Sequence, residues 1–244
     1  MTVEAPGKLV GAGRNADVYD VGNGRVLRRY RDGREPGYVA TEAQVMTHAR
    51  AHGAPVPEVF DVSGSDIVME RATGPTMLDA IARRPWTVGA QARLLAELHD
   101  LVHGVPITGV SGLELPAPFG TERPEEGDVL LHRDLHPQNV ILTQRGPVII
   151  DWEGAVRGPA VADVGMTWVI TGFSDIPGPR WRAVAARGVQ AALTRSFLLA
   201  AGPLDDAWRL TAIRWRLTDP NLLPSEAARL RKLVAAELPS DVSA

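Results

Sequence analysis

The stretch that decides the fold is HRDLHPQNV, at residues 132–140, which gathers two histidines, an aspartate, an arginine and an asparagine within eight positions. Taken alone, this composition fits three kinds of structure: a metal-binding cluster, a charged surface turn, or the catalytic loop of an enzyme. The residues on either side of the stretch are needed to separate these alternatives.

A second polar group follows the stretch at a short distance. After the apolar run VIL and the turn TQRGP comes VIIDWEG at 148–154, which puts Asp151 at the end of a second apolar strand. Two strands joined by a tight turn bring the loop before one and the loop after the other to the same end. We therefore expect Asp134, Asn139 and Asp151 to lie close together.

The residue types in this group suit a magnesium site. Carboxylate and carboxamide oxygens are ligands for Mg²⁺, which usually shares its remaining positions with water and phosphate. In that arrangement Asp134 stays free to accept a proton from a hydroxyl group or to orient that hydroxyl for attack.

The N-terminal part offers candidates for phosphate binding. GAGRNADV, at 11–18, lies between two strand candidates, and the small residues Gly11 and Gly13 let backbone N–H groups approach phosphate oxygens. A G-x-G sequence also occurs in ordinary hairpin turns, so both interpretations stay open. The strand RVLRRY, at 25–30, adds Arg28 and Arg29, and the helix that follows adds Glu42.

The arginines of this strand are separated by its alternation. Side chains alternate between the two faces of a strand, so Val26, Arg28 and Tyr30 share one face and Arg29 lies on the other. Only one arginine can therefore point into a cleft, and we expect it to be Arg28. A cation on a strand paired with an acid on the next helix is the arrangement that holds nucleotide phosphates in kinase-type sites.

Hydrophobic patterning predicts two unequal parts. Residues 8–30 form short apolar runs with a hairpin turn at Asn23-Gly24, and a helix at about 38–51 and strands at 58–62 and 66–71 complete an N-terminal nucleotide-binding lobe over 1–72. From 73 to 244 the pattern is mainly helical and predicts a catalytic and acceptor-binding lobe. Its helix at 87–103 carries a stripe that we expect to face a core: Leu94, Leu95, Leu98, Leu101 and Val102.

Composition excludes several classes of protein. With 244 residues, 45% of them hydrophobic, the chain can bury a large core. A formal charge of −3 without a Lys/Arg block argues against a nucleic-acid partner. There is no cysteine for disulfides or thiolate chemistry, and no apolar run of about 18 residues. We expect a cytoplasmic protein without a membrane partner, and the oligomeric state stays open.

HRDLHPQN together with IIDWE resembles the catalytic and metal-binding loops of the aminoglycoside phosphotransferase family. The resemblance implies an α+β, bilobal, protein-kinase-like fold, with a small antiparallel β lobe containing one helix and a larger, mainly helical lobe. It also implies ATP and Mg²⁺ as cofactors and a small-molecule hydroxyl as acceptor, such as an aminoglycoside, another antibiotic, or an amino-sugar or alcohol metabolite.

Roles carried over from the family fall on residues that match its motifs. Asp134 would be the catalytic aspartate, and Asn139 and Asp151 the Mg²⁺ ligands. The backbone of ERATG, at 70–74, would receive adenine through Glu70 and Ala72. The remaining implied roles are the helix acid and an aspartate that supports the catalytic loop from behind: Glu42 and Asp163.

Two positions depart from the family pattern. Arginine stands where the family has lysine, so the phosphate-binding cation would be Arg28 or, as the second choice, Arg29. Arginine is longer, planar and forked, and it does not replace lysine conservatively at a packed phosphate site. The third glycine of the loop is absent, and Ala16 is nearest to its position.

Other functions compete with phosphoryl transfer. A metal-dependent hydrolase would use His132, Asp134 and His136 as ligands for zinc or manganese, and a non-catalytic nucleotide-binding module would explain the missing lysine. We expect His132 to hold the loop in place, and we expect a surface or helix-end position for His48, His52, His99 and His103. An acidic loop could attract a cationic acceptor: Glu122, Glu125, Glu126 and Asp128.

Overall fold

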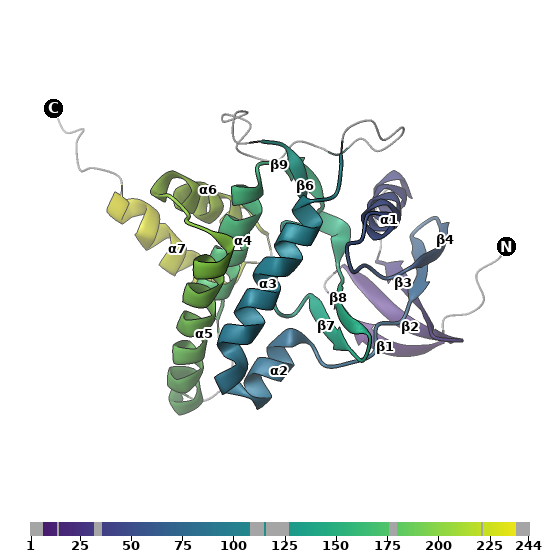
Figure 1. Cartoon of the computed structure of the whole chain (residues 1–244), viewed down its shortest axis with the longest axis horizontal. Helices are drawn as coiled ribbons and strands as arrows, with labels where there is room; N and C mark the ends of the chain where they lie inside the picture. The colour runs from purple at the N-terminus through teal and green to yellow at the C-terminus, as the bar shows by residue number, and fades with distance from the viewer. Residues whose placement is uncertain are drawn as a thin grey trace.

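The computed structural model describes residues 7–13, 15–31, 36–107, 115, 127–175, 180–220 and 222–237. A β-sheet with one helix forms the N-terminal part, and helices dominate the rest (Figure 1). The expected α+β organisation is therefore confirmed.

The N-terminal sheet has five strands in the order β1-β2-β3-β5-β4, with every neighbouring pair antiparallel. The predicted hairpin turn joins β2 to β3, where Asn23 and Gly24 adopt φ angles of 51° and 71°. Both angles are left-handed, which suits the mirror-image turns that match strand twist. The strands are β1 Lys8–Ala12, β2 Ala16–Gly22, β3 Arg25–Tyr30, β4 Val59–Ser63 and β5 Asp66–Glu70.

Helix α1, Pro36–Ala51, packs against this sheet. Its residues Val39 and Met46 are buried in one core with Tyr30 of β3 and Ile67 of β5. The helix ends where Gly53, at a φ of 91°, reverses the chain before β4. The expected single helix on the sheet is therefore present, and it carries Glu42 over β3.

In the described residues, the C-terminal part contains helices α2 to α7 and two small two-stranded sheets. Helix α3 packs along α5, and α4 packs against both α5 and α6 (Figure 1). Strand β6 pairs with β9, and β7 pairs with β8. The helical bounds are α2 Met77–Arg83, α3 Val88–His103, α4 Ala160–Phe173, α5 Arg180–Ala201, α6 Asp206–Arg216 and α7 Pro224–Glu237. The strand bounds are β6 Val129–Leu131, β7 Val140–Thr143, β8 Gly146–Ile149 and β9 Val156–Gly158, with 3₁₀ turns η1 Pro85–Thr87 and η3 Trp152–Gly154.

The predicted core stripe of α3 needs a correction. Leu95, Leu98 and Val102 are buried, but Leu101 is 48% exposed and His99 takes its place in the core at 1% exposed. A helix turns by about 100° per residue, so Leu101 points about 100° away from Val102 and leaves the buried face. The prediction that His99 lies at the surface is therefore wrong.

The connection between β5 and α2 is held closely against β7. The Leu142 N–H donates to the Pro75 carbonyl at 2.9 Å. A side chain at Gly74 would place its Cβ only 2.1 Å from the Leu142 carbonyl oxygen, so this position requires glycine. The division of the chain into lobes 1–72 and 73–244 stays a prediction. In the part of the chain described, no helix has the length and apolar character needed to cross a membrane.

Candidate active site

The β7–β8 hairpin brings the predicted polar residues to one end. Val140 pairs with Ile149, and the Ile150 N–H donates to the Asn139 carbonyl at 2.9 Å. Asn139 therefore precedes one strand and Asp151 follows the other at the open end of the same hairpin. This is the arrangement that the sequence predicted.

Asn139 is bonded directly to the loop that carries Asp134. Its Nδ2 donates to both the main-chain carbonyl and the Oδ2 of Asp134, each at 2.9 Å. Among the described residues nothing donates a hydrogen bond to Asn139 Oδ1. The side chain of Asn139 is thus fixed by its nitrogen, and its oxygen remains available as a ligand.

Asp134 is a charged group at the mouth of this site. Its side chain is 43% exposed, and His136 Nε2 lies 3.4 Å from its Oδ1. Partial burial favours the neutral acid, but the hydrogen bond from His136 and the positive potential of His136, His132 and Arg216 outweigh it and lower the pKa of Asp134. The side chain is therefore a carboxylate at neutral pH.

Two residues near the hairpin adopt a backbone conformation that L-residues rarely use. Arg133 and Asp151 both have φ of 67°, in the left-handed region. Such conformations cost on the order of 1 kcal/mol or more and persist where surrounding contacts enforce them. At Arg133 the enforcing contact is Asp163, whose carboxylate accepts the N–H of His132 at 3.0 Å and that of Arg133 at 2.6 Å.

Asp163 thus lies where the resemblance placed it, behind the loop. It is fully buried, and His103 Nε2 lies 3.2 Å from its Oδ2. Burial opposes its charge, but His103, His99 and His132 hold the pKa of Asp163 well below its usual range. His103, which we expected only at a helix end, is therefore part of the support of the loop at 132–139.

His132 is a structural residue in this arrangement. Its buried ring donates through Nε2 to the Ile150 carbonyl at 3.1 Å and accepts the Asp134 N–H through Nδ1 at 3.3 Å. Burial lowers the pKa of His132, consistent with a neutral ring that donates at one nitrogen and accepts at the other. A hydrolytic metal cluster needs one of these nitrogens, and the described residues contain no group of three ligands for a metal. The arrangement therefore does not favour the hydrolase alternative.

The side chain of Arg28, on strand β3, reaches from the N-terminal sheet to Asp151 at the end of the β7–β8 hairpin. Its guanidinium contacts Glu42 Oε1 through NH1 and Asp151 Oδ1 through NH2, both at 2.6 Å. Burial opposes the charge of Arg28, but the two carboxylates raise its pKa. Arg29 points the other way and forms a two-point ion pair with Asp66, with Nε at 2.8 Å and NH2 at 2.7 Å. The prediction that Arg28 faces the site is therefore confirmed.

Glu153 is a further member of this group, which the sequence pattern did not predict. Its Oε1 accepts a hydrogen bond from Asn15 Nδ2 at 2.9 Å, and its Oε2 lies 3.5 Å from Arg28 NH2. Its carbonyl accepts the hydroxyl of Tyr38 at 2.5 Å. Glu153 therefore links the β1–β2 loop, β3 and α1 to the segment after Asp151. The available signal was an acidic side chain two positions after the metal-ligand candidate.

The glycine-containing loop forms a tight hairpin. The Gly13 N–H donates to the Ala16 carbonyl at 2.8 Å, and a side chain at Gly13 would place its Cβ 3.1 Å from that oxygen. At Gly11 a Cβ would meet only ordinary contacts. The hairpin interpretation is thus correct for the backbone, and phosphate binding by Gly11 and Gly13 stays a prediction.

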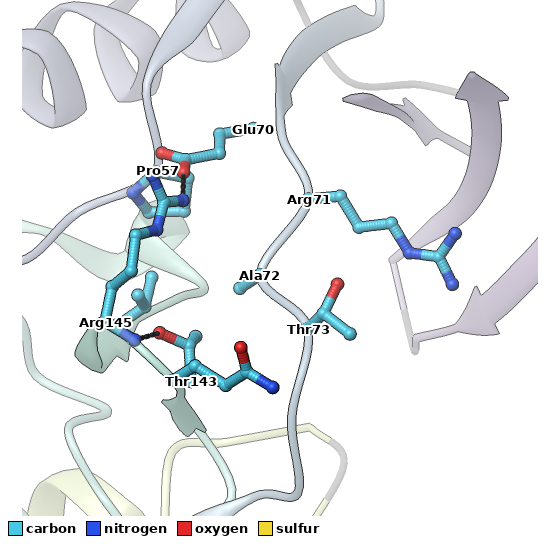
Figure 2. A pocket seen from close by; sticks show the side chains of 9 residues that line it. Pro57, Glu70, Arg71, Ala72, Thr73, Thr143 and Arg145 are labelled. Atoms are coloured by element: carbon cyan, nitrogen blue, oxygen red, sulfur yellow. Dashed lines mark hydrogen bonds and ion pairs between the residues drawn. The ribbon is translucent and has the colours of Figure 1, made fainter. Parts of the chain in front are cut away.

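The segment after β5 borders a cavity of about 360 Å³. Figure 2 shows Glu70, Ala72, Thr143 and Arg145 on one side of this segment, while the Arg71 side chain extends to the other side. Glu70 pairs with Arg145 of the β7–β8 turn. The cavity is lined by Pro57, Glu70, Arg71, Ala72, Thr73, Thr143, Gln144, Arg145 and Val148, and not by the residues around Asp134. Adenine binding by the backbone of Glu70 and Ala72 stays a prediction.

The acidic loop lies largely outside the described residues, because the positions of Glu122, Glu125 and Glu126 are not described. Its last acid, Asp128, forms an ion pair with Arg157 at 3.2 Å. The described part of the loop therefore gives no support to an attraction for cations.

A family model for phosphotransferase enzymes matches residues 7–119 and 113–203. The chain belongs to the phosphotransferase enzyme family. The match extends through the N-terminal β-sheet, the loop at 132–139 and helices α2 to α5 of the C-terminal part. A search of curated proteins returns no match.

Solved structures of similar fold include aminoglycoside phosphotransferases and a choline/ethanolamine kinase family protein. A thermostable mutant of aminoglycoside phosphotransferase APH(4)-Ia is 19% identical, with a TM-score of 0.64 over 93% of this chain and 92% of that one. The gentamicin complex of APH(2")-IIa is 12% identical, with a TM-score of 0.60 over 85% and 82%. A choline/ethanolamine kinase family protein from Mesorhizobium loti is 17% identical, with a TM-score of 0.53 over 98% and 83%. The expected protein-kinase-like fold of this phosphotransferase is therefore confirmed.

Proposed function

We propose that this phosphotransferase moves the γ-phosphoryl group of ATP, with Mg²⁺, to a hydroxyl group of a small molecule in the cytoplasm. The observation that carries the proposal is the assembly of Asp134, Asn139 and Asp151 at one end of the β7–β8 hairpin, with the guanidinium of Arg28 against Asp151. In the proposed reaction they would act as a base, two oxygen ligands and a phosphate-binding cation in one place.

The residues present fit a magnesium ion. Asn139 offers a side-chain oxygen that accepts no hydrogen bond from described residues, and Asp151 offers a carboxylate that is 40% exposed. Both are hard oxygen donors, as Mg²⁺ requires. When bound, the ion would supply charge neutralisation between the phosphate oxygens.

Asp134 would orient the acceptor. As a carboxylate it accepts a hydrogen bond from the acceptor hydroxyl and directs the oxygen toward the phosphorus. Its lowered pKa makes it a weak base, which is sufficient because phosphoryl transfer passes through a loose transition state that needs little nucleophile activation. The hydroxyl proton moves to Asp134 Oδ as the new O–P bond forms and the bond to ADP breaks.

Arg28 would hold the phosphates of the nucleotide. Its guanidinium is fixed from behind by buried Glu42, which also accepts a hydrogen bond from the Tyr30 hydroxyl. The forked head lies between that acid and Asp151, so it can donate to a phosphate oxygen beside the metal ligand. Glu42 therefore positions the cation instead of touching the nucleotide.

The acceptor is proposed as a class only. The similar structures include a complex with gentamicin and a choline/ethanolamine kinase family protein, which support a hydroxyl-bearing small molecule. A non-catalytic nucleotide-binding module is the second candidate, favoured by arginine at the position of the family lysine.

The decisive experiment measures ADP release and nucleotide binding in two variants. Asp134→Asn should lower kcat by about 10²–10⁴-fold with little change in ATP affinity. Asp151→Asn should weaken Mg²⁺-dependent ATP binding and nearly abolish transfer while the fold survives. Full activity in either variant would contradict the proposal. A wild-type protein whose melting temperature rises with Mg²⁺ and ATP, but which releases no ADP with any acceptor, would establish the non-catalytic module instead.

A further inference from the structure

We propose that the acceptor carries an anionic group, a carboxylate or a phosphate, which the guanidinium of Arg133 binds beside Asp134. The inference rests on the proposed function, because it concerns the molecule whose hydroxyl Asp134 orients. It goes further in naming the substrate class as hydroxylated anions, in place of polyamines such as aminoglycosides.

Arg133 occupies a position in which its backbone is held rigidly. It directly precedes Asp134, has φ of 67°, and donates its N–H to buried Asp163 at 2.6 Å. A left-handed conformation is costly for arginine and would suit glycine better. The fold therefore holds this side chain in one direction at a cost in backbone energy, which is a feature of functional sites.

The side chain of Arg133 extends across the C-terminal end of α6. Its guanidinium carbon lies 4.1 Å from the centre of the Trp215 ring. Stacking on tryptophan leaves the edge of a guanidinium, with its N–H groups, free to donate to an anion. The ring thus contacts the cation without using its hydrogen-bond donors.

No acid forms an ion pair with this cation in the part of the chain described, although Asp163 and Asp134 favour its charge from a greater distance. The buried Nε of Arg133 has no hydrogen-bond partner. Other arginines near the site are paired: Arg28 with Glu42 and Asp151, and Arg216 with Asp219 and Glu226. Burial also lowers the pKa of Arg133, which reflects the cost of holding its charge in that place.

The balance of energies points to a missing anion. A partly buried charge without a directly bonded counter-charge costs up to several kcal/mol in desolvation, and a cation–π contact returns only about 0.5–2 kcal/mol. A carboxylate or phosphate on a ligand would supply the counter-charge and accept two parallel hydrogen bonds from the guanidinium of Arg133. A cationic acceptor in the same place would be repelled by Arg133.

The position next to Asp134 connects this anion site to the reaction. Arg216, which follows Trp215, contributes positive potential at Asp134, so the end of α6 borders both side chains. An acceptor held by its anionic end at Arg133 would present a neighbouring hydroxyl to Asp134. The same atoms move as before: the hydroxyl oxygen gains the phosphoryl group, ADP leaves, and the proton passes to Asp134.

The test uses four probes that share a sugar skeleton: D-gluconate, D-glucose 6-phosphate, D-glucose and D-glucosamine. Melting temperatures are measured with each probe at constant ionic strength in the presence of Mg²⁺ and a non-hydrolysable ATP analogue, and ADP release is measured with ATP. We expect gluconate, glucose 6-phosphate or both to stabilise the wild type more than glucose does, with glucosamine weakest. The first two probes separate a carboxylate site from a phosphate site.

Variants assign the effect to Arg133. Arg133→Gly removes the charge and suits the left-handed backbone, so it should fold at least as well as the wild type. It should lose the preference for the anionic probes by at least about tenfold in affinity or kcat/KM, and Arg133→Lys should keep part of it. Arg157→Met is the control for net charge, because Arg157 is half-exposed on β9 and pairs with Asp128.

Three results would overturn the inference: stronger binding of glucosamine than of both anions, an unchanged preference in Arg133→Gly, or no stabilisation by either anion. Failure of the proposed function is recognised separately, as a wild-type melting temperature that Mg²⁺ and the nucleotide analogue leave unchanged when no sugar is present. If the anionic probes still stabilise the protein in that case, loss of this stabilisation in Arg133→Gly would still assign anion binding to Arg133.

Discussion

Replacing Arg28 with methionine removes a cation that two carboxylates share. Arg28 is buried, with its side chain 10% exposed, and its two contacts of 2.6 Å reach Glu42 and Asp151. Glu42 is 1% exposed, so it cannot recover its lost partner from water. Breaking one side of a buried pair costs about 3–5 kcal/mol, and the more exposed Asp151 adds little to this. We expect a loss of about 3 kcal/mol in the free energy of unfolding.

Arg29→Met is the matched control on the same strand. Its ion pair with Asp66 lies at the surface, with the arginine 37% exposed, and surface pairs contribute about 0–1 kcal/mol. The two substitutions change net charge and β-propensity alike. A difference of about 2 kcal/mol between them in urea unfolding therefore measures the buried pairing alone.

Measurements of activity should also distinguish Arg28 from Arg29. Arg28→Met should weaken ATP binding or transfer by at least about tenfold, equivalent to about 1.4 kcal/mol, measured by ADP release at a temperature where the variant remains folded. Arg28→Lys should retain measurable transfer because it keeps the charge. Equal stability and equal activity in Arg28→Met and Arg29→Met would refute the role assigned to Arg28.

Two further predictions concern His99 and Asp163, which lie behind the loop at 132–139. Burial lowers the pKa of His99 from 6.5 to about 4. Between these two pH values His99 is protonated in the unfolded chain but neutral in the folded chain, so the free energy of unfolding should decrease as the pH is lowered from 6.5 to 4. From pH 7 to pH 5, His99 should account for a loss of roughly 2 kcal/mol in the free energy of unfolding. If the urea midpoint of a His99→Gln variant drops as steeply over this range as that of the wild type, His99 is not the cause of the loss. Asp163→Ala should destabilise the fold by about 2–6 kcal/mol, since it leaves the N–H groups of His132 and Arg133 without their acceptor. Asp163→Glu, which keeps the charge in a longer side chain, should lower kcat even where it stays folded, and unchanged kcat in that variant would show that the loop needs no fixed support.

Local sequence was sufficient for the N-terminal strands and helix and for the β7–β8 hairpin, but it did not predict the pairing of β6 with β9. Asn23-Gly24 predicts its turn because both residues tolerate positive φ, and the apolar runs around TQRGP predict two paired strands. Once these strands pair, the positions of Asn139 and Asp151 follow from chain connectivity. Alternation in RVLRRY likewise predicts the direction of Arg28, because side-chain direction in a strand is a property of neighbouring residues.

Contacts between segments that are far apart in the sequence could not be predicted from local sequence. His99 and Leu101 differ by two positions on α3, and only the packing of the neighbouring helices decides which is buried. The links of Glu153 to Asn15 and Arg28, and of Arg133 to Trp215, join residues far apart in the sequence. The sequence by itself determined the chemical groups, their spacing along each strand and the direction in which Arg28 points. Tertiary structure alone decided which charged side chains form ion pairs and which, as with Arg133 among the described residues, form none, because an ion pair depends on the distance between elements that are far apart in the sequence.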